Sequence, residues 1–227
     1  MPSARKILKL DHPFEMRRGG ALHDVEIAYE TWGDLAFCHD NAILIFTGLS
    51  PSAHAASSTE DPSPGWWEDM IGPGRPIDTR RYFVICVNSL GSPFGSTSPA
   101  TINAATGKPY RLTFPVLTVE DIAKVGHEVA QSLGVKQLAA VVGPSLGGMT
   151  VLAYCALFPD AARSVISISA SARSMPFAIA LRSLQREIIR RDPLWQDGNY
   201  TIGSMPVTGM LLARKVGLIT YGSAKEW

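Results

Sequence analysis

The chain has 227 residues, of which 46% are hydrophobic and 18% charged, and its formal net charge is +1 at neutral pH. This length and composition are typical of a soluble globular protein with one good-sized core. The balanced charge excludes the strongly basic class of proteins that bind nucleic acid or anionic membranes. No apolar stretch is long enough to cross a bilayer, and Met1–Lys6 lacks the apolar centre of a signal peptide.

The cysteines Cys38, Cys86 and Cys155 are odd in number and show no paired ligand spacing. They therefore predict buried free thiols in a reducing cytoplasm and no metal site.

Alternating strands and helices are predicted along the chain. Val25, Ile27 and Tyr29 alternate with polar residues, as in a half-exposed strand near a sheet edge. Continuous apolar runs, typical of parallel strands covered on both faces, follow at Ala42–Phe46, Tyr82–Val87, Leu138–Val142 and Ser164–Ser169. Apolar stripes predict helices at Val119–Leu133, with Thr118 as the N-cap and Gly134 at the end, at Met149–Phe158 and at Phe177–Arg191. This alternation predicts an α/β sheet that is mostly parallel, with helices on both faces. Long loops rich in Ser, Pro and Gly at 50–74 and 88–115 are the kind that carry function.

The motif Gly143-Pro144-Ser145-Leu146-Gly147 fits G-x-S-x-G and lies between a predicted strand and a predicted helix. A strand, a sharp turn and a helix form a nucleophile elbow, in which the serine hydroxyl is exposed in a strained turn that needs small neighbours. The context predicts that Ser145 is a catalytic nucleophile.

A serine nucleophile needs a base, yet all five histidines precede Ser145 in the chain. His54 follows the strand Ala42–Phe46 and is the histidine expected nearest the site, either as the base or in a structural or substrate-shaping role. The other explanation is that the acid and the base lie beyond Trp227.

Arginines recur every four residues on the predicted helix Phe177–Arg191, at 182, 186 and 190. They are either a solvated basic face or, because Arg binds carboxylates in a fork, a site for a carboxylate-bearing substrate.

Several motifs together resemble those of the homoserine O-acetyltransferase family of α/β-hydrolase-fold acyltransferases. They are Ala28–Gly33, Gly65–Trp67, Ile71–Thr79, Tyr82–Cys86, Asn88–Gly91, Gly95–Thr97, Ile102–Tyr110 and Val141–Met149. The segments Gly48–His54, Ser183–Glu187 and Ala213–Tyr221 are most similar to the serine O-succinyltransferase branch. The resemblance implies a cytoplasmic enzyme of cysteine or methionine biosynthesis that binds no cofactor and forms a homodimer.

The implied reaction is an acyl transfer in two steps. Ser145 takes a succinyl or acetyl group from acyl-coenzyme A, and the hydroxyl of L-serine or L-homoserine then removes it. Homoserine O-acetyltransfer proper, ester hydrolysis and an inactive fragment remain alternatives.

In a nucleophile elbow, one oxyanion donor is the backbone N–H of the residue after the nucleophile, here Leu146, and the other comes from the loop after an early strand, for which Leu49 is the candidate. The resemblance implies roles for other residues. Arg186 holds the amino-acid carboxylate, and Tyr221 and Asn88 lie near the substrate. The loop that sets acyl or substrate specificity consists of Ser50, Pro51, Ser52, Ala53 and His54.

The family continues past Trp227, and its catalytic acid and base lie in that continuation. We therefore expect residues 1–175 to be an incomplete hydrolase core and residues 176–227 to be the start of a helical lid.

Overall fold

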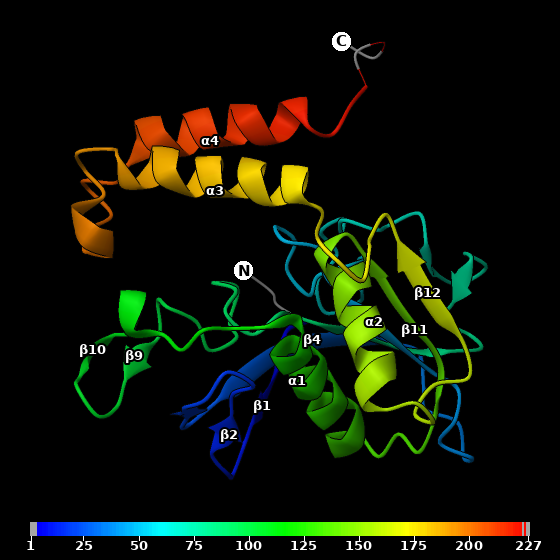
Figure 1. Cartoon of the computed structure of the whole chain (residues 1–227). Helices are drawn as coiled ribbons and strands as arrows, with labels where there is room; N and C mark the ends of the chain where they lie inside the picture. Colours follow the sequence, from blue (N-terminus) through cyan, green and yellow to red (C-terminus); the bar gives the residue numbers. More distant parts are fainter. Residues whose placement is uncertain (1–3, 224, 226–227) are drawn as a thin grey trace. The chain divides into compact units, whose positions relative to one another are not determined.

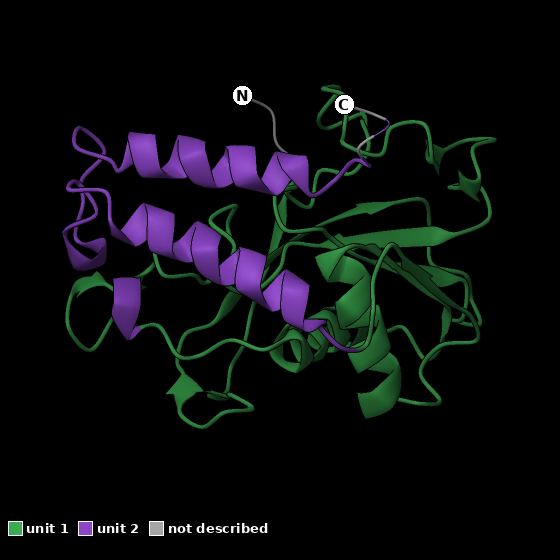
Figure 2. Cartoon of the chain, turned by 45° about the horizontal axis from the view of Figure 1, so that its top comes forward, with its two compact units in different colours: residues 1–110, 114–172 green, residues 111–113, 173–227 purple. Residues whose placement is uncertain are grey.

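The computed structural model describes residues 4–223 and 225. The chain forms two compact units (Figure 2): unit 1 comprises residues 1–110 and 114–172, and unit 2 comprises residues 111–113 and 173–227. The chain passes from unit 1 to unit 2 between Ala172 and Arg173, where the sequence analysis expects the division between residues 175 and 176.

A six-stranded sheet is the centre of unit 1, with the strand order β1-β4-β8-β5-β11-β12. Figure 1 labels β1, β4, β11 and β12 of this sheet. Its strands are β1 (Lys6–Lys9), β4 (Glu26–Trp32), β5 (Ala42–Phe46), β8 (Phe83–Val87), β11 (Leu138–Pro144) and β12 (Val165–Ile168). Strands β8, β5, β11 and β12 run parallel, whereas β4 and β1 are antiparallel to their neighbours. The predicted fold class, a mostly parallel α/β sheet, is confirmed.

The two faces of the sheet bury different clusters because successive side chains alternate. On β5, Leu44 and Phe46 pack toward the helices α1 (Val119–Ser132) and α2 (Leu146–Leu157). Ile43 and Ile45 point the other way, into a cluster with the segment 55–82. In the described part of unit 1, this segment covers the second face of the sheet. The sequence had predicted helices on both faces.

Strand β4 is more buried than its alternation suggests. Ala28 is fully buried and Glu30 is 4% exposed, although both lie on the face expected to be solvated. Loops cover that face, since Ser96 accepts a hydrogen bond from the Ala28 N–H and His54 pairs with Glu30. Strand β1, which the sequence analysis missed, occupies the sheet edge instead.

Helix α1 begins as predicted, with Thr118 as its N-cap in a capping box. The Thr118 hydroxyl accepts a hydrogen bond from the Asp121 N–H, and the Asp121 carboxylate accepts one from the Thr118 N–H. Helix α2 begins at Leu146, directly after the expected nucleophile and three residues earlier than predicted.

Strand β12 is an exposed sheet edge. Val165, Ile166 and Ile168 are 49%, 47% and 36% exposed, whereas the neighbouring β11 is largely buried. An apolar edge strand of a parallel sheet is normally covered.

Unit 2 contains a pair of packed helices, α3 (Pro176–Arg190) and α4 (Val207–Ile219), of which the sequence analysis missed α4. Gly209, Ala213 and Gly217 lie four residues apart and so share one face of α4. A Cβ on Gly209 would come within 3.0 Å of the backbone of Ile188 and Ile189, so glycine permits the close approach of α3.

The remaining elements are short. They are β2 (Phe14–Glu15) with β3 (Ala21–Leu22), β6 (Ile71–Gly72) with β7 (Ile77–Asp78), β9 (Ile102–Asn103) with β10 (Lys108–Pro109), and the 3₁₀ turns η1 (Arg111–Thr113) and η2 (Gln196–Gly198). No helix among the described residues is both long and apolar enough to cross a membrane.

Candidate active site

Ser145 stands in the strained turn that the motif predicts. Its φ of 54° and ψ of −117° place a non-glycine residue at positive φ, between the end of β11 and the start of α2. Its side chain is exposed. A residue held in such a conformation is strained, and strain of this kind is concentrated at functional sites. Ser145 therefore has the geometry of a nucleophile.

The glycines around Ser145 are required by space. A Cβ on Gly143 would overlap the backbone of Gly147, and a Cβ on Gly147 would overlap the carbonyl oxygens of Phe46 and Thr47. A Cβ on Gly148 would lie 2.6 Å from the Ala170 Cβ and 2.9 Å from the Gly143 oxygen. The elbow is thus packed against the end of β5 with no room for a methyl group.

Three neighbouring parallel strands end beside the nucleophile. In the registers of β5 with β11 and β8, Ile45 lies opposite Val142 and Phe46 opposite Val87. Continuing these registers by one to three residues places Gly48 beside Ser145 and Asn88 beside Thr47. The Thr47 and Ser89 hydroxyls are 3.3 Å apart, which agrees with this placement. Ligands of open α/β sheets bind at this carboxyl edge.

The expected oxyanion donors both lie at this edge. The Leu146 N–H is at the N-terminus of α2, where the first N–H groups have no acceptor within the helix. Leu49 follows Gly48 in the loop after β5, and its side chain is 73% exposed. Their role as an oxyanion hole remains a prediction.

No described histidine hydrogen-bonds to the Ser145 hydroxyl. His39 bonds to the Gly134 oxygen, and the His127 ring stacks on Phe158 and bonds to the Tyr154 hydroxyl. His12 contacts Pro13 and Glu128, and His23 lines a groove that also contains His12.

His54 is held on both sides of its ring. Its Nδ1 is 2.9 Å from the Glu30 Oε2, and its Nε2 is 2.9 Å from the Ser63 carbonyl oxygen. The His54 side chain is 17% exposed and the Glu30 side chain 6%. Because a carbonyl and a carboxylate only accept hydrogen bonds, this geometry favours a ring that donates from both nitrogens, that is, an imidazolium, and the bonds to Glu30 and Ser63 raise the His54 pKa. Of the roles that the sequence left open for His54, the structure favours the structural one over the base.

Glu30, His54 and Ser63 have the composition of a catalytic triad without its hydrogen-bond directions. The Ser63 Oγ lies 3.2 Å from the His54 Nε2 but donates its hydrogen to the Asp61 Oδ1 at 2.6 Å. A triad histidine must accept the serine proton. Since His54 has no free lone pair, Ser63 is not activated by it.

Neither Glu30 nor Ser63 was predicted from the sequence. A glutamate in the middle of the apolar run Ile27–Trp32 was the available signal for Glu30, because a buried carboxylate requires a partner. No comparable signal marks Ser63.

Asn88 is fully buried at the end of β8. Its N–H donates to the Ala28 oxygen, and its side-chain Nδ2 lies 3.3 Å from the Ser96 Oγ. The Asn88 Oδ1 is buried without a hydrogen-bond partner among the described residues. Its predicted place near a substrate remains a prediction.

Arg186 and Tyr221 belong to unit 2. Arg186 is exposed on α3 and forms no ion pair or hydrogen bond with the described residues, whereas Arg182 bonds to Gln185 and Arg191 to Glu187. Tyr221 is 72% exposed just after α4. Arg190, also exposed on α3, likewise forms no ion pair or hydrogen bond with the described residues, so the guanidinium of either Arg186 or Arg190 is available for a carboxylate.

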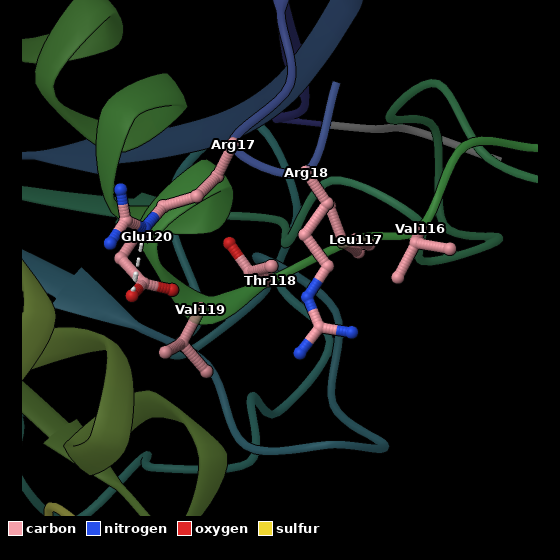
Figure 3. A pocket seen from close by; sticks show the side chains of 7 residues that line it. All are labelled: Arg17, Arg18, Val116, Leu117, Thr118, Val119 and Glu120. Carbon is pink, nitrogen blue, oxygen red and sulfur yellow. Dashed lines mark hydrogen bonds and ion pairs between the residues drawn. The ribbon is translucent and has the colours of Figure 1, made fainter. Parts of the chain in front are cut away.

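An open pocket of about 610 Å³ lies at the start of α1, lined by Arg17, Arg18 and residues 116–120 (Figure 3). Arg17 is paired with Glu120, and its backbone N–H donates to the Asp121 carboxylate. The capping box places the Asp121 carboxylate at this helix end, and Glu120 lies beside it, so these two negative charges disfavour an anionic ligand in the pocket. No group of three or more potential metal-ligating side chains occurs in the described ranges.

Comparison with known proteins places this elbow in a family. The family model described as alpha/beta hydrolase fold matches residues 41–226. The chain belongs to the alpha/beta hydrolase fold family. This assignment confirms the fold expected from the resemblance.

The resemblance to the serine O-succinyltransferase branch is also confirmed. The chain is 60% identical over all 227 residues to a serine O-succinyltransferase of Litchfieldella anticariensis and covers 62% of that protein. Among solved structures, the esterase E22 matches 97% of the chain with a TM-score of 0.89 and 31% identity, over 62% of its own length. A homoserine O-acetyltransferase from Bacillus anthracis matches 95% of the chain with a TM-score of 0.88 and 32% identity, over 59% of its length. The chain thus spans about three fifths of the proteins it matches.

Proposed function

We propose that this hydrolase-fold chain is the nucleophile-bearing part of a serine O-succinyltransferase. The observation that carries the proposal is the 60% identity over all 227 residues to a protein of that name. The strained, exposed Ser145 and the glycine-packed elbow support a covalent acyl-enzyme.

The proposed reaction has two balanced steps. The Ser145 Oγ attacks the thioester carbonyl of succinyl-CoA, and its proton passes to a base. The C–S bond breaks, and coenzyme A leaves as the thiol after taking that proton from the base. The hydroxyl of L-serine then attacks the acyl-enzyme and gives its proton to the base, the bond to the Ser145 Oγ breaks, and O-succinyl-L-serine leaves as the base returns the proton to Ser145. In each step the N–H groups of Leu49 and Leu146 stabilise the oxyanion, each contributing about 3 kcal/mol.

Further parts of the proposal concern the substrates. Arg186 binds the carboxylate of L-serine in a fork. Its guanidinium is exposed and has no partner among the described residues, and the resemblance of Ser183–Glu187 to the serine O-succinyltransferase branch favours it over Arg190. Tyr221 and Asn88 are further substrate-binding candidates suggested by the resemblance, and residues Ser50–His54 select the acyl group. The functional enzyme is a cytoplasmic homodimer.

The catalytic base and its acid lie, in this proposal, beyond Trp227. The five histidines of the chain bond elsewhere or line a groove away from Ser145. The exposed apolar edge of β12 supports the proposal that further strands pair with β12.

Release of coenzyme A by the complete gene product tests the proposal. Succinyl-CoA and acetyl-CoA are each offered with L-serine and with L-homoserine, and Ser145→Ala is the matched control. We expect coenzyme A to be released fastest with succinyl-CoA and L-serine. In the Ser145→Ala control the rate of release should fall by at least about 1,000-fold, because the nucleophile has been removed. No release with any pair would contradict acyl transfer, and acetyl-CoA with L-homoserine as the best pair would point to O-acetylation of homoserine.

Ester hydrolysis is the second candidate, since the likeness to the esterase E22 equals that to the acetyltransferase. A chromogenic short-chain ester distinguishes the two. Turnover that L-serine does not accelerate would favour water as the acceptor, whereas formation of an O-acylated amino acid would favour transfer.

A further inference from the structure

The ion pair between Glu30 and His54 joins the loop after β5 to the sheet. Glu30 is on β4, two strands away from β5 in the sheet order, and His54 closes the loop that begins at Thr47. The contact of 2.9 Å is between side chains that are 6% and 17% exposed. A pair that is this buried is screened much less by salt than a surface pair.

The same part of the loop is held from a second direction. The Trp66 Nε1 donates to the Ser52 oxygen, and the Trp66 N–H donates to the His54 oxygen. Gly65 packs so closely on the backbone of Ala55 that a Cβ would not fit. The segment 63–67 therefore packs against Ser52–His54 and restricts their movement.

The loop from β5 thus has two fixed ends. Its first end is the close contact of Phe46 and Thr47 with Gly147, and its second end is His54. Leu49 lies between them. Its own side chain is 73% exposed and does not anchor the loop.

We propose that Glu30 and His54 are a positioning pair that sets the backbone of residues 49–53 beside Ser145, with His54 acting as a doubly protonated clamp and not as a base. The inference rests on the proposed acyl transfer for its effect on rate, but not for the state of the ring. A displacement of about 1 Å at a reacting centre can cost a factor of 100 in rate, so a clamp on the oxyanion loop has catalytic consequences.

The groups around the ring favour its charged form. Glu30 faces it from β4, and Asp61 and Glu68 lie on the covering segment. Cys86, opposite Glu30 on β8, has its thiol pKa raised by burial and by the Glu30 charge and stays neutral. Burial is the largest effect on the His54 pKa and lowers it, but the bonds to Glu30 and Ser63 and the nearby carboxylates outweigh it, so the pKa lies above that of an ordinary histidine.

Nitrogen NMR of the histidine rings tests the clamp without any need for activity. In the complete gene product labelled with ¹⁵N-histidine, His54→Gln assigns the His54 signals by their loss. We expect both His54 nitrogens to carry a proton at pH 7 and to lose one only at a pH above the ordinary histidine range. A ring with an unprotonated Nε2 at pH 7 would overturn the proposal, because such a ring is a neutral acceptor.

Kinetics test the positioning role. Glu30→Gln keeps the shape of the side chain and an acceptor oxygen but removes the charge, and the matched control is Glu128→Gln, which removes the carboxylate of the exposed His12–Glu128 pair. We expect Glu30→Gln to lower kcat about 10- to 100-fold with KM changed less than threefold, because a misplaced oxyanion donor acts on the transition state. The alkaline limb of its pH profile moves to lower pH, while the control keeps the parent profile.

The outcomes separate this inference from the proposed function. A gene product that forms no acyl-enzyme but has a doubly protonated His54 would contradict the proposed acyl transfer and support the doubly protonated state of His54. An active enzyme in which Glu30→Gln leaves kcat and the alkaline limb unchanged would sink the positioning role. If His54→Gln fails to fold, the remaining histidine signals are assigned by substitution of the other four histidines, and Glu30→Gln still decides.

Discussion

Gly147→Ala tests how closely the elbow must approach the end of β5. The added Cβ would lie 2.8 Å from the Thr47 oxygen and closer still to the Phe46 oxygen, whereas ordinary contact begins at 3.4 Å. The Thr47 carbonyl alone would have to retreat by 0.6 Å, the difference between these two distances, and the Phe46 carbonyl by more. The backbone at the buried end of β5 has little freedom to move by these distances.

Two consequences follow from this displacement. Overpacking of this kind costs about 1–3 kcal/mol of stability. Because Thr47 leads directly to Gly48 and Leu49, a shift of roughly 1 Å also moves the expected oxyanion donor, which lowers kcat about 100-fold.

The assay compares urea unfolding and succinyl-CoA turnover in the complete gene product. The matched control is Gly203→Ala, because no atom lies within 4 Å of a Cβ at that position. We expect the control to stay within about 0.5 kcal/mol of the parent. If Gly147→Ala were as stable and as active as the parent, the close approach would not be what requires glycine in the motif.

Three further predictions concern the cap, the nucleophile and the clamp. Thr118→Ala removes one partner of the α1 capping box and should lower the free energy of unfolding by about 1 kcal/mol, as read from urea melts; an unchanged midpoint would contradict the role of the cap. In the complete gene product, a fluorophosphonate should label the peptide that contains Ser145 and not the one that contains Ser63, and detection of a modified Ser63 peptide by mass spectrometry of the digest would contradict this prediction. Because the pKa of His54 is raised in the folded state, its contribution to stability should be complete below the ordinary histidine pKa and should be lost as the pH rises through the folded-state pKa. Glu30→Gln should reduce this pH dependence of the free energy of unfolding, as read from urea melts at several pH values. The same pH dependence in both proteins would refute the prediction.

The parallel core of the sheet was predictable because its signals are local. The runs at 42–46, 82–87 and 138–142 are continuous and apolar, which suits strands covered on both faces, and all became neighbouring strands. Strand β1 and helix α4 were missed. Strand β1 is short and largely exposed, and α4 is apolar on most sides, so neither shows a clear period.

The candidate site was predictable only in part. The elbow follows from its motif, because only glycine fits at Gly143 and Gly147. The partner of His54 did not follow, because Glu30 is 24 residues away in the chain and meets it only when the loop folds over β4.

The sequence by itself determined the elbow, the strained position of Ser145 within it and the parallel strands that lead to it, since these depend on short-range spacing and on residue size. Tertiary structure decided what the histidines do. A histidine beside an oxyanion loop is equally compatible with a base and with a clamp until the acceptors around its ring are known, and these come from β4 and from the covering segment. Hydrogen-bond direction in three dimensions, not proximity in the chain, assigns the role of His54.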